Sequence, residues 1–380
     1  MRRRTWALIL QIDSNISSHL GLPRRVPESQ FDTAEPRSLY DTDFDESTTE
    51  LPPPRPETEV TAALYTRTKL RLISIGNRVT DLLTRPSPYT YADALNLIRQ
   101  LDAVHDAFPA SLKWQGFASS IAVPSQLTIQ RIWLEMCVLR GKLALMNKFL
   151  LAPHRADAEQ QQGRRDEYAQ SRLVCVDAAT KILEFQHFLD EETRVDGLLY
   201  QSRWNITATF MNDFLLAASI LCFILQITPP HGEEQQHQQP RDEPGSGSGK
   251  TGTDSGHDIA ESFKVNGRIR KLLRMSQAIW RRRSAVSKEA RKVTAALRYV
   301  LGDSDEVGSE PGSASFDSRA DVDGMPNLNV FSEFATGAYL PEFSDLMPGY
   351  DLTNFNSDLP NNIGDYAGAG NFQQPTSISR

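Results

Sequence analysis

The sequence predicts an all-α protein in which only part of the chain folds. Apolar residues recur at steps of three and four along most of residues 65–226, which is the spacing of one helix face. No run of alternating β-branched residues competes with this pattern. Hydrophobic residues make up 39% of the 380 residues, below the usual globular share, so some segments should stay outside any core.

Four apolar stripes place helices within this stretch. The first stripe comprises Ala94, Leu97, Leu101, Val104 and Phe108. The second begins after Pro124 and comprises Ile129, Ile132, Trp133, Met136, Leu139, Leu143, Met146 and Leu150. The third comprises Cys175, Ala178, Ile182, Phe185 and Leu189. The fourth comprises Trp204, Ala208, Met211, Leu215, Ala218, Cys222 and Leu225.

The fourth stripe raises the question of a membrane span. Phe214–Ile227 is almost wholly apolar but has only 14 residues. Extending it towards the N-terminus includes Asp213, and an aspartate at the bilayer centre costs about 2.5–3.5 kcal/mol on insertion scales. Apolar stretches of about 10–14 residues are typical of buried helices. We therefore predict a core helix and no membrane contact, with a membrane-associated protein as an alternative.

Charge is distributed unevenly along the chain. The net charge of −7 excludes a uniformly basic nucleic-acid-binding protein, although it allows a local basic patch. Residues 28–59 hold ten acidic residues against two arginines and include a Leu-Pro-Pro-Pro run, which predicts an extended segment. Residues 268–300 hold eleven Lys and Arg against one glutamate. Residues 303–380 hold thirteen acidic residues against two arginines.

These changes in composition divide the chain into four predicted segments. They are a helical domain (1–228), a disordered linker (229–260), a basic amphipathic helix (261–301) and a disordered acidic tail (302–380). The net charge of the tail should keep it expanded and its aromatic residues exposed, which is typical of activation domains. The candidate activation residues are Phe331, Phe334, Phe343 and Phe355.

The basic helix has three interpretations that the sequence leaves open. Its cationic face packs on the acidic residues 28–59 or on the acidic tail, or Arg281, Arg282 and Arg283 form a nuclear import signal, or the helix contacts phosphates non-specifically. Its apolar positions indicate that one side docks on protein. These positions are Val286, Ala290, Val293, Leu297 and Val300.

No catalytic or metal-binding constellation is recognisable in the sequence. The three cysteines, Cys137, Cys175 and Cys222, are too few and too widely spaced for a disulfide framework or a zinc site, and suit a reducing compartment. Residues 245–251 resemble a phosphate-binding loop, but Pro244 replaces its first glycine and no strand precedes it. The acidic residues 41–46 lack the glycine and distal glutamate of a calcium loop. We predict no cofactor, no metal and no enzymatic activity.

The first residues form a motif with family character. An Arg-rich segment with a tryptophan leads through an aspartate and a serine to a Gly-x-Pro turn, and the acidic segment that follows ends in Leu-Pro. The motif residues are Arg3, Arg4, Trp6, Asp13, Ser17, Gly21 and Pro23. This motif resembles a signature of the fungal-specific transcription factor domain, the all-α regulatory region of binuclear zinc cluster regulators. Residues 202–204 (Ser-Arg-Trp) and 212–214 (Asn-Asp-Phe) are similar to the C-terminal half of that domain.

The resemblance covers about residues 1–228 and implies a nuclear transcriptional regulator. Its implied partners are the transcription machinery or a coactivator, with homodimerisation left open. Family members usually carry six closely spaced cysteines that bind two zinc ions and place a helix in the major groove. No such cluster stands in this sequence, so we expect a truncated family member that binds neither zinc nor a specific DNA site. The alternative is a helical enzyme or scaffold protein without a recognisable active site.

Overall fold

The protein is all-α in the part of the chain that the computed structural model describes, which confirms the predicted fold class. The described residues are 2–20, 24–150, 161–227, 255–285 and 287–302, and they contain eight α-helices and no strand. The helices are α1 (Arg2–Leu20), α2 (Ala62–Leu83), α3 (Tyr91–Asp106), α4 (Ser125–Leu150), α5 (Gln161–Glu192), α6 (Arg203–Ile227), α7 (Ser255–Arg283) and α8 (Lys288–Leu301).

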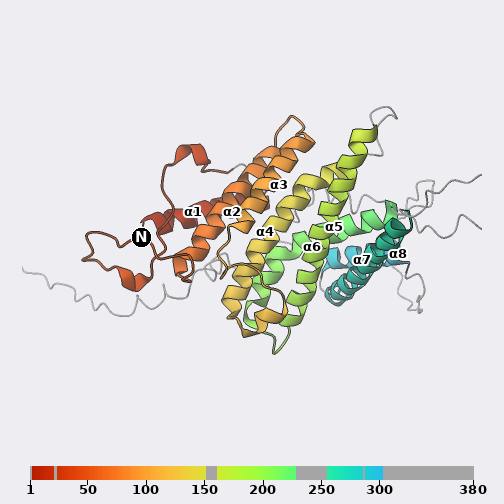
Figure 1. Ribbon diagram of the computed structural model, residues 1–380. Coiled ribbons are helices and arrows are strands. Elements are labelled where there is room, and N and C mark those ends of the chain that lie inside the picture. The colour runs from red at the N-terminus through yellow and green to blue at the C-terminus, as the bar shows by residue number, and fades with distance from the viewer. Residues whose placement is uncertain (1, 21–23, 151–160, 228–254, 286, 303–380) are drawn as a thin grey trace, which may run out of the picture.

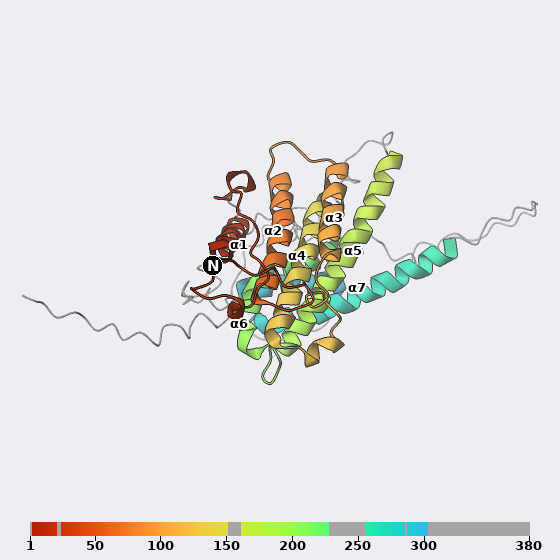
Figure 2. The ribbon, with the colours of Figure 1, turned by 60° about the vertical axis from the view of Figure 1, so that its left-hand side comes forward.

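The helices α1 to α6 form a bundle in which each helix packs on its neighbours, and α7 and α8 form a second layer over α5 and α6. α1 lies beside α2, and α2 and α3 pack on α4, which packs in turn on α5 (Figure 1). α6 packs on α5, and the pair α7 and α8 covers α5 and α6. Figure 2 shows the N-terminal part of α7 extending away from the bundle. The acidic segment between α1 and α2 is extended apart from two short 3-10 turns, Glu28–Gln30 and Asp41–Asp43.

The predicted apolar stripes contribute to the core of the bundle. Ile132 and Leu143 on α4, Ile182 on α5 and Ala218 and Cys222 on α6 are each at most 1% exposed. The prediction fails at Trp204, which is 63% exposed; in this first turn of α6 the core contact is made by Ile206, which is 4% exposed, and Trp204 lies on the solvent side.

α6 is a core helix, as predicted. Thr209–Ile227 is long and apolar enough to cross a membrane, but 67% of its most apolar window is buried inside the protein. A core helix of this composition meets the same criterion, and the side chains of Phe214, Leu221 and Ile224 contact the other helices rather than forming an exposed belt.

Local sequence signals explain where α3 and α4 begin and how closely they approach. The Thr90 hydroxyl accepts a hydrogen bond from the Asp93 N–H (3.2 Å), and the Asp93 carboxylate accepts one from the Thr90 N–H (2.9 Å). This reciprocal capping box starts α3. α4 begins directly after Pro124, as predicted. Gly141 lets α4 approach α3, because a Cβ at this position would lie 2.9 Å from Leu101 Cδ1.

The single basic helix predicted over 261–301 is wrong, because this region holds two helices. The Ser287 hydroxyl accepts a hydrogen bond from the Ala290 N–H (3.1 Å) and starts α8 afresh, while Gly302 ends it in a left-handed conformation (φ 75°). α7 begins at Ser255, inside the predicted linker. Residues 228–254 and 303–380, which hold the rest of the linker and the tail, lie outside the described residues.

α7 and α8 share the core of the bundle, and the predicted docking is confirmed at Ala290, Val293 and Leu297; Val300 is half-buried, and Val286 lies outside the described residues. Trp280 is 1% exposed, and Ala290, Val293 and Leu297 are buried. The Ser276 hydroxyl donates to the Gln186 Oε1 atom of α5 (2.7 Å) in the same interface.

Candidate functional site

The candidate site lies where α1 and the acidic segment cover one face of α2. α1 is anchored to α2 by two polar contacts: Gln11 Nε2 donates to the Thr66 carbonyl (3.3 Å), and the Ser14 hydroxyl donates to Asn77 Oδ1 (2.7 Å). Ala7 faces α2 and is 2% exposed. The opposite face of α1 is apolar and exposed, and it consists of Ile9, Ile12 and Ile16.

Asp13 turns the chain back along α1. Its two carboxylate oxygens accept hydrogen bonds from the backbone N–H groups of Arg25 (3.1 Å) and Val26 (3.0 Å). These contacts fix the start of the acidic segment beside α1 and bring Arg24 to the same side as Trp6. The aspartate of the family motif therefore has a structural role in placing the segment that follows it.

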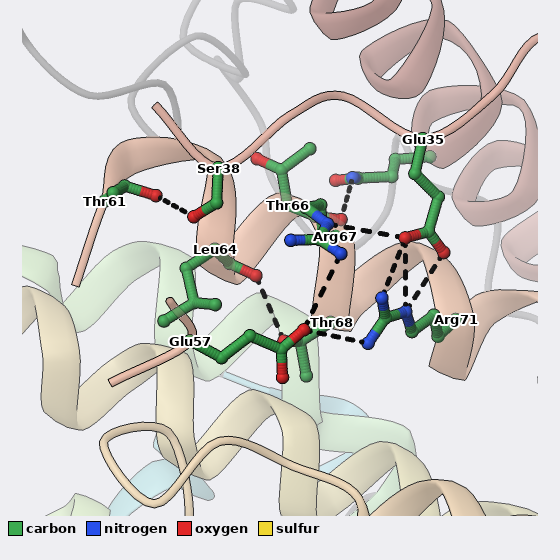
Figure 3. Close-up of polar contacts among 10 residues, drawn as sticks. Glu35, Ser38, Glu57, Thr61, Leu64, Thr66, Arg67, Thr68 and Arg71 are labelled. Carbon is green, nitrogen blue, oxygen red and sulfur yellow. Dashed lines mark hydrogen bonds and ion pairs between the residues drawn. The ribbon is translucent and has the colours of Figure 1, made fainter. Parts of the chain in front are cut away.

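Two arginines of α2 contact the acidic segment near its start and near its end (Figure 3). Arg71 Nη2 lies 3.0 Å from Glu35 Oε2, and Arg71 Nη1 lies 3.3 Å from Glu57 Oε1. Arg67 lies 3.4 Å from Glu35 and 3.6 Å from Glu57. Burial alone would raise the pKa of Glu35, but the hydrogen bonds and charge of Arg71, followed by those of Arg67, hold this pKa below its ordinary value. Glu35 is therefore charged at neutral pH, where it pairs with both arginines.

A second set of contacts fixes the rest of the segment. Arg4 pairs with Asp41, donates to the Leu39 carbonyl (2.7 Å) and lies over the Phe44 ring. Arg55 contacts Asp43 through both Nε (2.7 Å) and Nη2 (2.6 Å). In the acidic cluster at residues 41–46, Asp41 and Asp43 therefore pair with arginines, whereas Asp45 accepts hydrogen bonds from Ser47 and Thr48. Among the described residues there is no group of three or more side chains that could hold a metal ion.

These anchors border a cavity that lies between α1, the acidic segment and α2 and is open to solvent on one side. Its volume is about 410 Å³. The apolar part of the wall includes Leu10, Leu70 and Ile73, and the Trp6 ring meets the Phe31 ring edge-on with centroids 5.7 Å apart. The polar part of the wall is supplied by Arg3, Arg24, Glu28, Thr33, Glu35, Arg71, Ser74 and Asn77.

Two nitrogen donors at this cavity have no acceptor among the described residues. Trp6 Nε1 and Arg24 Nη1 are both covered from solvent and unpartnered. The other terminal nitrogen of Arg24 is used, because Nη2 donates to Asp81 Oδ2 (2.7 Å). Buried N–H groups almost always find a partner, so these two donors are exceptions within the described part of the chain.

The structure brings the described motif residues to this one region. Arg3 and Trp6 line the cavity, Arg4 and Asp13 anchor the acidic segment, and Ser17 is buried on α1. Gly21 and Pro23 lie outside the described residues, as do the candidate activation residues Phe331, Phe334, Phe343 and Phe355.

The three arginines of the predicted import signal end α7, far from this cavity in the fold. Arg281 is exposed, and Arg282 pairs with Asp190 of α5. Burial lowers the pKa of Arg283 from its ordinary value. The proposed docking of the acidic residues 28–59 on this basic region is wrong, because the acids of that segment that form ion pairs contact arginines of the segment itself, α1 and α2.

Arg24, Arg67 and Arg71 were missed from sequence. Arg67 and Arg71 lie one turn apart on α2, and that spacing directly after an acid-rich segment is a signal that could have predicted the pairing. Arg24 has no such signal, because its place at the cavity depends on how Asp13 directs the chain.

The comparisons with known proteins point to one functional class. The chain is 47% identical to the pyrrolocin cluster transcription factor fsdR of a fungal species, over 98% of this chain and 46% of the relative. It is 44% identical to the transcription factor phm2 of Pyrenochaetopsis, over 93% of this chain and 42% of the relative. The chain is a homologue of fungal transcription factors.

The name of a further relative states the type of transcription factor to which that relative belongs. The Zn(2)-C6 fungal-type transcription factor mpsB of Macrophomina phaseolina is 35% identical over 79% of this chain and 37% of its own length. The chain thus spans less than half the length of the relatives it matches. No family model matches the chain, and no solved structure is significantly similar to it.

Proposed function

We propose that this chain is the helical regulatory part, with an activation tail, of a nuclear zinc-cluster regulator that controls a fungal gene cluster. The observation that carries the proposal is the match to the pyrrolocin cluster transcription factor, which extends over 98% of this chain, including its basic and acidic C-terminal parts. Relatives named as fusarisetin A and equisetin cluster transcription factors support the same role.

In this proposal the chain itself makes no zinc-dependent contact with DNA. Its three cysteines lie on separate core helices, α4, α5 and α6. Burial raises the pKa of Cys137 to about 11 and that of both Cys175 and Cys222 to about 12. Zinc ligation requires the thiolate, so buried thiols with raised pKa values are poor ligands. Sequence-specific DNA binding would need residues other than these.

The activating part is assigned to residues 303–380. This tail combines a net charge of −11 with nine aromatic residues, and such segments activate by ordering briefly in a coactivator groove. In this proposal the aromatic side chains supply the apolar contact with the coactivator, and the acids supply the negative charge typical of such segments. The bundle would then carry the tail, and the nucleus would be the site of action.

The test is a reporter assay with the whole chain fused to an unrelated DNA-binding domain. We expect activation by this fusion and loss of most of the activity when the four phenylalanines are replaced by alanine. The replaced residues are Phe331, Phe334, Phe343 and Phe355. A matched control replaces neighbouring polar residues by alanine and should keep full activity. The control residues are Ser332, Thr336, Ser344 and Asn354.

The outcomes separate three explanations. Equal activity of the wild-type and phenylalanine-free fusions would mean that charge alone suffices. No activity from any fusion, with normal protein levels in the nucleus, would contradict an activating tail. Metal analysis and a competition gel shift on the purified chain test the remaining part of the proposal. Stoichiometric zinc, or a DNA sequence preference that survives excess random duplex, would contradict the proposal that the chain binds neither zinc nor a specific DNA site.

A further inference from the structure

We propose that the outer face of the α7–α8 pair binds the first part of the acidic tail, residues 303–323, which covers this face against other polyanions. The docking can be measured on the purified chain without transcription, so the proposal goes beyond the proposed function and does not rest on it. We call this surface the basic face, and it consists of Arg270, Lys271, Arg274 and Arg281 on α7 and of Lys288, Arg291 and Arg298 on α8.

The α7–α8 pair is strongly basic although the chain as a whole is acidic. Residues 255–302 hold twelve Lys and Arg against three acids, a net charge of +9, whereas the whole chain has a net charge of −7. Arg268 pairs with Glu184 of α5 and Arg282 pairs with Asp190 of α5, so both arginines lie on the flank of α7 that faces α5. The seven cations of the basic face are exposed and form no ion pair with any described residue. This surface therefore lacks a direct counter-charge in the described part of the chain.

Helix geometry places these cations on one side of each helix. Arg270, Arg274 and Arg281 recur at steps of four and seven along α7, and this spacing forms one row on a helix. The row lies opposite Leu272, which is buried in the bundle. On α8 the cations of the basic face lie opposite Val293, which is 2% exposed. Like charges at such spacing repel one another, so an anionic partner stabilises the face.

The tail is the acid-rich segment that fits this face. The other acid-rich segment, residues 28–59, already pairs with its own arginine and with those of α1 and α2. The tail begins at residue 303, directly after Gly302 ends α8. Seven of its thirteen acids fall within residues 303–323, so its density of negative charge is highest next to the basic face.

The direct connection to α8 favours the tail over a separate polyanion. The 14 residues of α8 extend over about 21 Å, whereas 21 residues of extended chain span up to about 70 Å. Residues 303–323 are therefore long enough to follow α8 and reach α7. A tethered partner acts at an effective concentration on the order of millimolar. The four candidate activation phenylalanines all lie beyond residue 323, so this docking leaves them available to a coactivator.

Zero-length crosslinking of the full-length chain tests the docking directly. A carbodiimide joins a carboxylate to a lysine amine only when the two groups are in contact. We expect links from acids of residues 310–321 to Lys271 or Lys288, and loss of most links at about 1 M salt, where the Debye length falls to about 3 Å. Mixing unlabelled and isotope-labelled protein distinguishes links within a chain from links between copies. Links spread equally over lysines elsewhere, such as Lys113 and Lys181, or formed mainly between copies, would overturn the proposal.

Matched tail variants test whether the acids cover the basic face. One variant neutralises six acids of residues 303–323, and the control neutralises six acids further along the tail, so both variants have the same net charge. We expect the first variant to bind a random-sequence DNA duplex at least tenfold more tightly than the wild type in fluorescence anisotropy at low salt, because freed cations contact phosphates. The control should bind as the wild type does. The first set is Asp303→Asn, Asp305→Asn, Glu306→Gln, Glu310→Gln, Asp317→Asn and Asp321→Asn, and the control set is Glu333→Gln, Glu342→Gln, Asp345→Asn, Asp351→Asn, Asp358→Asn and Asp365→Asn.

Arginine variants locate the duplex contact. In the background of the first tail variant, replacing the α7 row by glutamine should remove most of the gained affinity, whereas replacing three exposed arginines at α2 and α3 should keep it. The α7 set is Arg270→Gln, Arg274→Gln and Arg281→Gln, and the control set is Arg78→Gln, Arg85→Gln and Arg99→Gln.

Two outcomes of the binding measurements would overturn the docking. Equal gains in the two tail variants would mean that net charge alone governs duplex binding. Wild-type protein that binds the duplex as tightly as the first tail variant would make nucleic acid the occupant of the basic face. Circular dichroism melts identify any variant that fails to fold, and the crosslinking result on the wild type holds independently of the variants.

Discussion

Breaking the ion pair between Arg140 and Asp213 should destabilise the helical bundle strongly. Asp213 on α6 accepts two hydrogen bonds from Arg140 on α4, from Nε and from Nη2, each of 2.6 Å. The Asp213 side chain is 6% exposed and that of Arg140 is 34% exposed. Burial alone would lower the pKa of Arg140, but the carboxylate of Asp213 more than offsets this and holds it above its ordinary value. Arg140 is thus held in its charged form against Asp213.

The exposed fractions of the Arg140 and Asp213 side chains determine how much each substitution should lower the free energy of unfolding. Removing one partner of a fully buried pair costs about 3–5 kcal/mol. Arg140→Met leaves the nearly buried carboxylate unpaired, so we expect a loss of about 4 kcal/mol. Asp213→Leu leaves an arginine that water still reaches at one third of its surface, so the loss should be about 2–3 kcal/mol. Combining the two apolar substitutions should cost about 1 kcal/mol or less, because no charge is left unpaired.

The assay is urea unfolding followed by circular dichroism at neutral pH, analysed as a double-mutant cycle. Asp177→Asn is the control, since its pair with Lys181 has more than half of each side chain exposed and should be worth under about 0.5 kcal/mol. A double variant that loses the sum of the two single losses would refute the reasoning. So would single losses below about 1 kcal/mol.

Three further predictions concern other parts of the fold. Glu35→Gln should cost less than about 1 kcal/mol, because Glu35 is 40% exposed, but it should speed hydrogen exchange in residues 33–40. Because the folded pKa of Glu35 is lowered, its stabilisation is present above the unfolded value of about 4.3 and is lost as the pH falls through the folded value, so identical pH profiles for wild type and variant would contradict the pairing. Iodoacetamide at pH 8 should modify Cys175 and Cys222 only after unfolding in urea, as measured by mass spectrometry, because burial raises their pKa to about 12; fast labelling of the native protein would be contrary evidence. Ile12→Lys should leave the melting temperature unchanged, because Ile12 is 55% exposed, and should reduce self-association in light scattering; unchanged association would show that the apolar face of α1 is not a contact surface.

The spacing of apolar residues predicted the helices of the bundle well, because the residues that recur at steps of three and four are those that a helix buries on one face. The stripe from Cys175 to Leu189 became the buried face of α5, and α4 began directly after Pro124. Trp204 was misplaced because periodicity alone does not show which residue of the first turn faces the core, and in α6 this residue is Ile206. The break between α7 and α8 depends on Ser287, a local capping signal that a charge count over the whole region does not reveal.

The candidate site was predictable only in part. The motif drew attention to Trp6 and Asp13, but their function follows from contacts between segments. Asp13 binds backbone N–H groups at residues 25 and 26, and a backbone donor has no sequence signature. The acid-rich composition of residues 28–59 suggested a basic partner, yet not which one. Arg67 and Arg71 pair with the acids in preference to the basic residues of α7 and α8, because they lie on the helix that directly follows the acidic segment. Pairing over this short sequence distance closes only a small loop and costs less chain entropy.

α5, α6, α7 and α8 share one core, so non-covalent packing holds the pair α7 and α8 on the helices that precede residue 228, and the chain connection across residues 228–254 is not needed for it. Trp280 and Leu297 lie in the same core as Ile182 and Leu221, and the hydrogen bond from Ser276 to Gln186 crosses the interface. A protease that nicks this connection would therefore leave a non-covalent complex that elutes as one particle. Two fragments that end and begin within residues 228–254, expressed separately, would be expected to reassemble. A tail that activates transcription would stay with the N-terminal helices after such a cut.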